Sequence, residues 1–296
     1  MNREQLIEKL IKKNKGKKIP IYNRFDYFNR LIKPYKNNQY FIMQYLQGDG
    51  NELSGKFWSV ISSSRFAFEM YSWLANIDEI KDIRFELKLT GITNRGVPNM
   101  DVFIDYTDTL FFVESKFTES YPQIIDCNTL PAAYWKEKGD KEAFTTSKKP
   151  IGSTLIKRYH DDEEALKEFL WFIKTIKEEL EKLDDSLKPY TWMEYGQEIK
   201  HLYGLYFYLK EKEQHHYKKV EFYNVYYSFG DDINSAITLF FEEGEKMMNR
   251  LLKRYGIEFK YAPVTAQEVI NRFPDSAKAY EKDTTVKALL KNEFLI

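Results

Sequence analysis

The stretch that decides the fold covers residues 98–117 and reads PNMDVFIDYTDTLFFVESKF. Residues 99–106 and 109–117 are rich in β-branched and aromatic residues, and the dipeptide Thr107-Asp108 lies between them. This pattern predicts two antiparallel strands joined by a two-residue turn. Because apolar residues fall on both faces of the hairpin, we expect it to be buried between two layers of the protein.

The register of this hairpin brings three ionisable residues together. With a two-residue loop, Asp101 lies directly opposite Glu114, and opposite residues point to the same face of a sheet. Lys116 shares that face because side chains alternate along a strand. The pattern Glu-x-Lys occurs five times in the chain, so it has little meaning alone. Only Glu114 and Lys116 also have an acid on a predicted partner strand just upstream across a tight turn.

Two carboxylates on opposite strands repel each other at neutral pH unless a cation lies between them. Carboxylate oxygens with open positions for water and phosphate suit Mg²⁺, or Mn²⁺, as the bound ion. A neighbouring lysine can orient or help deprotonate a metal-bound water and can stabilise developing negative charge. Asp101, Glu114 and Lys116 are therefore predicted to form a catalytic site in which the two acids hold the metal. The alternative interpretation of the same three residues is a cross-strand ion pair at the surface.

The elements around the hairpin predict a mixed α/β fold built on one sheet. Apolar periodicity and β-branched runs predict, in chain order, a helix at 65–76, strands at 83–89, 99–106 and 109–117, helices at 163–183 and 197–209, a strand at 219–229, a helix at 233–255, a strand at 256–261 and a helix at 265–272. The predicted organisation is a basic N-terminal segment at 1–40, a core at 41–262 with a helical insertion at about 118–190, and a helical tail at 263–296.

Composition limits the classes of function. Of the 296 residues, 43% are hydrophobic and 30% are charged, a composition that favours a folded chain over a disordered one. Lys+Arg and Asp+Glu both number 45, so any binding of nucleic acid must depend on local patches. Residues 1–36 are the basic candidate, with 11 basic and 3 acidic residues. They are either an arm that contacts phosphates or a solvated helix end.

We expect a cytoplasmic protein without a membrane partner. The N-terminus lacks the apolar segment of a secretion signal, and no apolar run approaches the roughly 18 residues that span a bilayer. The single cysteine, Cys127, excludes an internal disulfide and a multi-cysteine zinc site. The four histidines show no zinc-like spacing with other ligands.

Pro98-Asn99-Met100-Asp101 followed by Glu114-Ser115-Lys116 resembles the signature of the PD-(D/E)XK nuclease superfamily, whose members share the restriction-endonuclease-like fold. The stretch departs from the signature because two residues separate the proline from the first acid. The core of that fold is a helix, three strands, a helix and a strand, which is the order predicted here over about 60–230. The resemblance therefore implies a mixed sheet flanked by helices, to which this chain adds a helical insertion.

The resemblance also implies roles for two residues outside the hairpin. In that superfamily the helix before the strands often supplies a further acid to the metal site, and Glu69 matches that position. The helix after the motif often bears a polar residue near the site, and Gln197 matches it. The implied catalytic set is Asp101, Glu114, Lys116, Glu69 and Gln197, with Asp101, Glu114 and Glu69 as metal ligands.

The function implied is Mg²⁺- or Mn²⁺-dependent hydrolysis of a phosphodiester by a metal-activated water. The expected protein is a DNA endonuclease whose partner is double-stranded DNA. Because cutting both strands with one site per chain needs two chains or two binding events, a homodimer is expected. Two alternatives stay open. One is a catalytically inactive nuclease-fold protein that binds DNA or acts as a scaffold, and the other is a nuclease specific for RNA or for nucleic-acid structure.

Overall fold

A computed structural model describes residues 38–47, 53, 57, 62–90, 97–116, 162–182, 195–211, 217–226 and 235–273. The basic segment predicted at 1–40 lies outside these residues except at its last three positions. The insertion predicted at 118–190 also lies outside them except for residues 162–182. In the described part of the chain, no helix is both long enough and apolar enough to cross a membrane.

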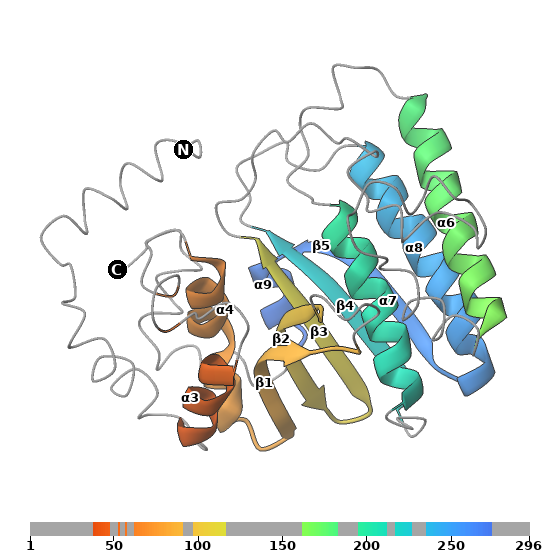
Figure 1. The fold of residues 1–296 in the computed structure, drawn as a ribbon. Coiled ribbons are helices and arrows are strands. Elements are labelled where there is room, and N and C mark those ends of the chain that lie inside the picture. The colour runs from red at the N-terminus through yellow and green to blue at the C-terminus, as the bar shows by residue number, and fades with distance from the viewer. Residues whose placement is uncertain are drawn as a thin grey trace, which may run out of the picture.

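Five strands form one mixed sheet in the order β1-β2-β3-β4-β5. They are β1 (Ile80–Lys88), β2 (Asn99–Tyr106), β3 (Thr109–Lys116), β4 (Lys219–Tyr226) and β5 (Glu258–Thr265). The first three strands are antiparallel neighbours, whereas β4 runs parallel to β3 and β5 runs parallel to β4. The prediction of an α/β fold around one mixed sheet flanked by helices is confirmed (Figure 1).

Parallel neighbours need crossover connections, and two helices lie in them. α7 (Tyr195–Glu211) precedes β4, and α8 (Ser235–Leu252) connects β4 to β5 through a 3₁₀ turn at Lys253–Tyr255. Both helices pack on the same face of the sheet. The long helix α6 (Glu163–Glu181) packs against α8 on the side away from the strands (Figure 1). The site described below lies where α7 crosses β3 and β4.

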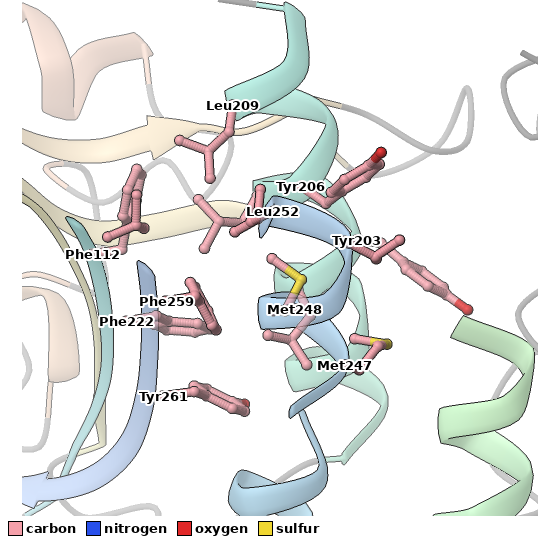
Figure 2. Packing of buried hydrophobic residues seen from close by; sticks show 14 of the residues in the cluster. Phe112, Tyr203, Tyr206, Leu209, Phe222, Met247, Met248, Leu252, Phe259 and Tyr261 are labelled. Atoms are coloured by element: carbon pink, nitrogen blue, oxygen red, sulfur yellow. The ribbon is translucent and has the colours of Figure 1, made fainter. Parts of the chain in front are cut away.

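The core on this face ties the strands to the helices. Phe222 on β4 and Tyr261 on β5 stack with their ring centroids 4.8 Å apart. Both rings point from the sheet toward the helix layer, where Met248 and Leu252 of α8 face them (Figure 2). Each large apolar side chain buried in this way contributes about 1.5–3 kcal/mol. This packing fixes α7 and α8 against the strands.

The opposite face is covered by α3 (Asn38–Gln47), α4 (Ser63–Tyr71), a 3₁₀ helix at Ser72–Asn76 and α9 (Ala266–Ile270). α4 begins at the predicted serine run, because the Ser62 side chain accepts a hydrogen bond from the third helical N–H at 3.1 Å. The core here is strongly aromatic, and its largest fully buried side chains are Phe41, Tyr45, Phe57, Phe68, Tyr71, Trp73 and Phe85.

The register predicted for the central hairpin is confirmed. β2 and β3 pair continuously from Tyr106 opposite Thr109 to Val102 opposite Val113. Thr107 has a φ of 52°, so this turn residue adopts the left-handed conformation. The hairpin is also buried as expected, since every residue of β3 is buried.

β5 crosses the predicted boundary between core and tail at residue 262, and α9 lies beyond it. β5 continues to Thr265, and α9 packs against the sheet with Val269 and Ile270 buried. The core therefore extends at least to Phe273, which is also fully buried. Pro263 is tolerated within β5 because proline in a strand is unfavourable except at an edge, and β5 is an edge strand.

Gly204 lets α7 approach the connection between β1 and β2 very closely. A Cβ at this position would lie 2.7 Å from Cγ of Pro98 and 3.1 Å from Cβ of Leu89. A larger residue would therefore push the helix away from the sheet. This confirms the close packing that a glycine inside a predicted helix suggests.

Candidate active site

The backbone pairing of β2 is interrupted at Asp101 on both sides. Its register with β1 is the same on both sides, with Phe85 opposite Val102 and Leu87 opposite Met100, but the pairing skips Asp101, and its pairing with β3 ends at Val102. In place of backbone pairing, Oδ2 of Asp101 accepts a hydrogen bond from the Ser115 N–H at 2.7 Å. A side chain thus holds β3 to β2 at the point where the ladder opens.

Glu86 lies opposite Asp101 on the other neighbouring strand. Its φ is 54°, a left-handed conformation that a residue with a Cβ seldom adopts within a strand. The charge of Glu86 contributes to raising the pKa of Asp101. Extension of the register by one residue beyond Phe85–Val102 and Val102–Val113 gives a row of polar residues, Glu86, Asp101, Glu114 and Asn224, in which Glu114 and Asn224 are a paired position.

Three side chains form a closed hydrogen-bonded triangle next to this row. Lys116 Nζ donates to Glu114 Oε1 at 2.9 Å and to Gln197 Oε1 at 2.8 Å. Gln197 Nε2 in turn donates to Glu114 Oε1 at 2.8 Å. Glu114 and Lys116 are buried, whereas Gln197 and Asp101 are half-buried. The structure thus brings together four of the five predicted site residues.

The fifth predicted residue, Glu69, is placed elsewhere. It lies on α4, and its carboxylate forms an ion pair with Arg65 one turn earlier, at 2.8 Å. Both side chains are buried, so the pair accounts for the burial of this acid. Within the described ranges, no three His, Cys, Asp or Glu side chains form a group that could hold a metal ion. The structure therefore does not group Glu69 with Asp101 and Glu114.

A second layer of buried polar residues lies behind Glu114. Glu198 is fully buried and accepts hydrogen bonds from Asn224 Nδ2 at 2.5 Å and from the Tyr261 hydroxyl at 2.8 Å. Asn224 is the direct neighbour of Glu114 across the parallel pair of β3 and β4. This places a second acid next to the first inside the protein.

His201 also faces Glu114 from α7. Its Nδ1 lies 3.8 Å from Oε2 of Glu114, and its ring also hydrogen-bonds the backbone of Asn99. Neither Nδ1 of His201 nor Oε2 of Glu114 has a hydrogen-bond partner, although both atoms are buried. Buried polar atoms without partners are uncommon in proteins, and they often mark functional sites.

The ionisable groups of the site perturb one another. Burial raises the pKa of Asp101 well above its usual value, and the charges of Glu114 and Glu86 raise it further. Burial, together with the charge of Glu114, raises the pKa of Glu198 to about 8. Burial lowers the pKa of His201, although the Glu114 carboxylate opposes this effect. The site thus contains several acidic side chains and one lysine, so the lysine balances the charge of only one of them. A bound cation would stabilise the ionised forms of the others.

Sequence reasoning missed Glu86, Glu198, His201 and Asn224. His201 was available from spacing, because it follows Gln197 by four residues and so lies on the same face of the helix. The positions of Glu86 and Asn224 depend on the pairing of β1 with β2 and of β3 with β4, which no local pattern specifies. Zinc-like spacing does not reveal a histidine that faces a single acid from another element.

Comparisons of the chain with protein-family models, with curated proteins and with solved structures found no match. The functional assignment therefore depends on the geometry of the site and on the resemblance of the motif.

Proposed function

We propose that this protein is a metal-dependent phosphodiesterase, and specifically an endonuclease that hydrolyses the DNA backbone. The observation that carries the proposal is the triangle of Glu114, Lys116 and Gln197 beside Asp101 at the opening of the β2–β3 ladder. The element order also supports it, since α4, β1, β2, β3, α7 and β4 follow the order of a helix, three strands, a helix and a strand that the resemblance implies.

The donor set fits a divalent cation. Oε2 of Glu114 is a buried carboxylate oxygen without a partner, and the Glu114 charge raises the pKa of Asp101. A cation bound by Asp101 and Glu114 would give Oε2 of Glu114 a partner. Its positive charge would also offset the effect of the Glu114 charge on the pKa of Asp101. Two carboxylates suffice, because Mg²⁺ keeps several waters of its own. When bound, such an ion supplies an activated water and neutralises charge on the phosphate.

The side chains of the chain itself supply position and charge. Lys116 is fixed between Glu114 and Gln197, so its ammonium group needs no rearrangement to stabilise charge that develops on a phosphate. Gln197 is a positioning residue, because it binds both members of the Glu114–Lys116 pair. Asp101 and Gln197 are the more accessible members, so we expect the substrate to approach from their side.

The proposal is tested by nicking of supercoiled plasmid with Mg²⁺ or Mn²⁺. We expect cleavage by the wild type that is abolished by EDTA. Removal of one preorganised group at such a site typically lowers the rate by about 100-fold or more. We expect Glu114→Gln and Lys116→Met each to show a loss of that size.

A matched control is Lys210→Met, which removes another lysine of α7 that binds a different acid, Asp162, at 2.9 Å. This variant should cleave at the wild-type rate per folded molecule. Metal-dependent cleavage that survives both Glu114→Gln and Lys116→Met would refute the assignment of the site.

The class of nucleic acid needs its own comparison, because the same metal chemistry acts on any phosphodiester. We expect duplex DNA to be cut faster than single-stranded DNA or RNA of the same sequence. If RNA is cut faster than duplex DNA, or branched duplex faster than linear duplex, the proposed substrate is wrong. The assignment of the site would still stand. Binding of DNA with no cleavage under any divalent metal would identify an inactive scaffold.

A further inference from the structure

The outer edge of β5 is a place where a further strand could join the sheet, because β5 ends the strand order. The inward side of β5 is identified by Glu258, whose N–H donates to the Lys218 carbonyl at 2.8 Å. Backbone groups of successive residues in a strand point to alternate sides. The residues whose backbone faces outward are therefore Ile257, Phe259, Tyr261, Pro263 and Thr265. An open row of such groups is a template on which another chain can pair.

Two side chains of α8, which packs beside β5, occupy the middle of this edge (Figure 1). Asn249 Oδ1 accepts from the Phe259 N–H at 2.9 Å, and Asn249 Nδ2 donates to the Phe259 carbonyl at 2.7 Å. These are the two hydrogen bonds that a directly opposite residue of an antiparallel strand would exchange with Phe259. One turn earlier on the helix, Glu245 Oε2 accepts from the Tyr261 N–H at 2.8 Å. α8 therefore bonds this edge in the way that a further strand would.

The two ends of the edge are closed as well. The Ile257 N–H donates to the carbonyl of Leu252, the last residue of α8, at 3.3 Å. Pro263 has no N–H to offer. At the far end of the strand, Glu268 Oε2 accepts from the Thr265 N–H at 2.6 Å. Every outward N–H group of β5 thus has a partner within the same chain.

The helix lies very close to the strand beside these contacts. A Cβ at Gly244 would lie 3.0 Å from Cδ1 of the Tyr261 ring, so a larger residue there would force the ring or the helix to shift. Glu245, the next residue of the helix, binds the backbone of the same tyrosine. The glycine and the hydrogen-bonding side chain therefore act at one position of the strand.

The opposite edge of the sheet shows the same type of contact. Gln44 on α3 accepts, through Oε1, a hydrogen bond from the Phe85 N–H of β1 at 2.8 Å. A side chain from a helix therefore bonds the backbone at both edges of the sheet. Covering an edge in this way is one of the means by which proteins avoid pairing of strands between molecules.

We propose that Glu245 and Asn249 of α8 seal the β5 edge and prevent a second copy of this chain from pairing a strand with it. The inference goes beyond the proposed function, because it concerns the assembly of the protein and not its chemistry. It also limits how a homodimer of this chain could form. The interface of such a dimer would lie on a surface other than the β5 edge.

The test removes both side chains from the full-length protein, in the double variant Glu245→Ala/Asn249→Ala. Alanine is the best helix former, so α8 itself should persist. Amide hydrogen exchange is measured residue by residue in dilute protein. We expect the outward amides of Phe259 and Tyr261 to exchange about tenfold faster than in the wild type, which is the scale of one net hydrogen bond.

The inward amides of the same strand are the internal reference. Those of Lys260 and Ala262 face β4, so their exchange should change much less in the double variant. A general loosening of the fold would instead speed the exchange of inward and outward amides together. The ratio between the two sets therefore separates a seal on the edge from a merely structural role.

The assembly state is measured by sedimentation over a range of protein concentrations. The wild type should keep one assembly state across the range, whereas the double variant should form larger species as the concentration rises. Lys246→Ala is the matched control, because it changes an exposed side chain of the same helix that binds Glu243 and not the strand. Glu245→Gln keeps an oxygen that can accept from the Tyr261 N–H. Both of these variants should behave as the wild type does.

Two results would overturn the inference. In the first, the outward amides of the double variant stay as protected as those of the wild type, so the two side chains do not close the edge. In the second, these amides exchange faster but the assembly state is unchanged at every concentration, so the opened edge recruits no second copy. If the double variant does not fold, Glu245→Ala alone gives the same test at Tyr261. Faster exchange there together with self-association supports the seal, and the lack of either result overturns it.

Discussion

α7 carries a buried polar cluster at each end, and the two clusters differ in how completely their charges are matched. Near the C-terminal end, Tyr206, Lys210 and Arg254 donate to one carboxylate oxygen of Asp162 at 2.6, 2.9 and 2.6 Å. The Ala165 N–H donates to the other oxygen at 3.1 Å. Burial would raise the pKa of Asp162, but Lys210, the Ala165 N–H and Arg254 together lower it below its usual value.

The cluster around Glu114, near the N-terminal end of the same helix, has the opposite character. The pKa of Asp101 and that of Glu198 are both raised, by burial and by the Glu114 charge. Glu114 and His201 each keep a buried atom without a partner. The comparison teaches that buried charge alone does not identify a functional site. The acids that the protein leaves unmatched are those that a bound cation would stabilise.

The largest difference in stability between the two clusters is expected from Glu198→Gln, a substitution in the cluster around Glu114. Its folded-state pKa of about 8 exceeds the usual 4.5, so the folded protein holds a proton that the unfolded chain releases. The stability that this bound proton contributes is therefore fully present below about pH 4.5. It is lost as the pH rises to about 8. Glutamine resembles the protonated acid and cannot ionise. The variant should be about 2–4 kcal/mol more stable than the wild type at pH 8, and equal to it near pH 4.5.

Urea denaturation between pH 4.5 and pH 8.5 measures this difference. Glu178→Gln, which changes an exposed acid of α6, should give a curve parallel to that of the wild type. If the curve of Glu198→Gln is also parallel to that of the wild type, Glu198 is not the buried proton carrier.

The second effect is a loss of stability in the matched cluster. Asp162→Asn keeps the size of the side chain but removes the charge that Lys210 and Arg254 contact. We expect a loss of about 1–3 kcal/mol at pH 7, measured by urea denaturation. The loss stays below that of a fully buried pair because about a third of each cationic side chain is exposed and solvent screens it. A variant as stable as the wild type would show that this cluster does not stabilise the fold.

The sequence predicted the hairpin and much of the site because those features are local. A two-residue turn fixes the register of Asp101 and Glu114, and strand alternation fixes the side of Lys116. Gln197 also reached the site as the resemblance implied, because a helix that connects β3 to β4 must cross β3. These predictions needed only the chain order of neighbouring elements.

The features that the sequence did not predict depend on contacts between distant elements. Glu69 has the spacing of a site acid, but Arg65 lies one turn earlier on the same helix and binds it. Glu198 and His201 meet Asn224 and Glu114 only through the packing of α7 on the sheet. The pairing of Glu114 with Asn224 required knowledge of the strand order. Helix periodicity alone would have classified these side chains as ordinary polar positions.

The smallest effect is a gain of stability in the cluster around Glu114. It is expected from Asp101→Asn, the same type of substitution as Asp162→Asn in the other cluster. Asp101→Asn removes an acid whose ionised form is disfavoured, and its amide oxygen can still accept from the Ser115 N–H. Because Asp101 is half-buried, solvent screens part of the penalty, and we expect a gain of about 1 kcal/mol or less at pH 7 with EDTA present. A saturating divalent cation should stabilise the wild type by mass action and the variant much less, so the order of the two should reverse. Thermal denaturation with and without the cation measures both steps. If Asp101→Asn lowers stability as Asp162→Asn does, and the cation does not distinguish it from the wild type, the two ends of α7 are equivalent and the argument for a metal at the N-terminal end fails.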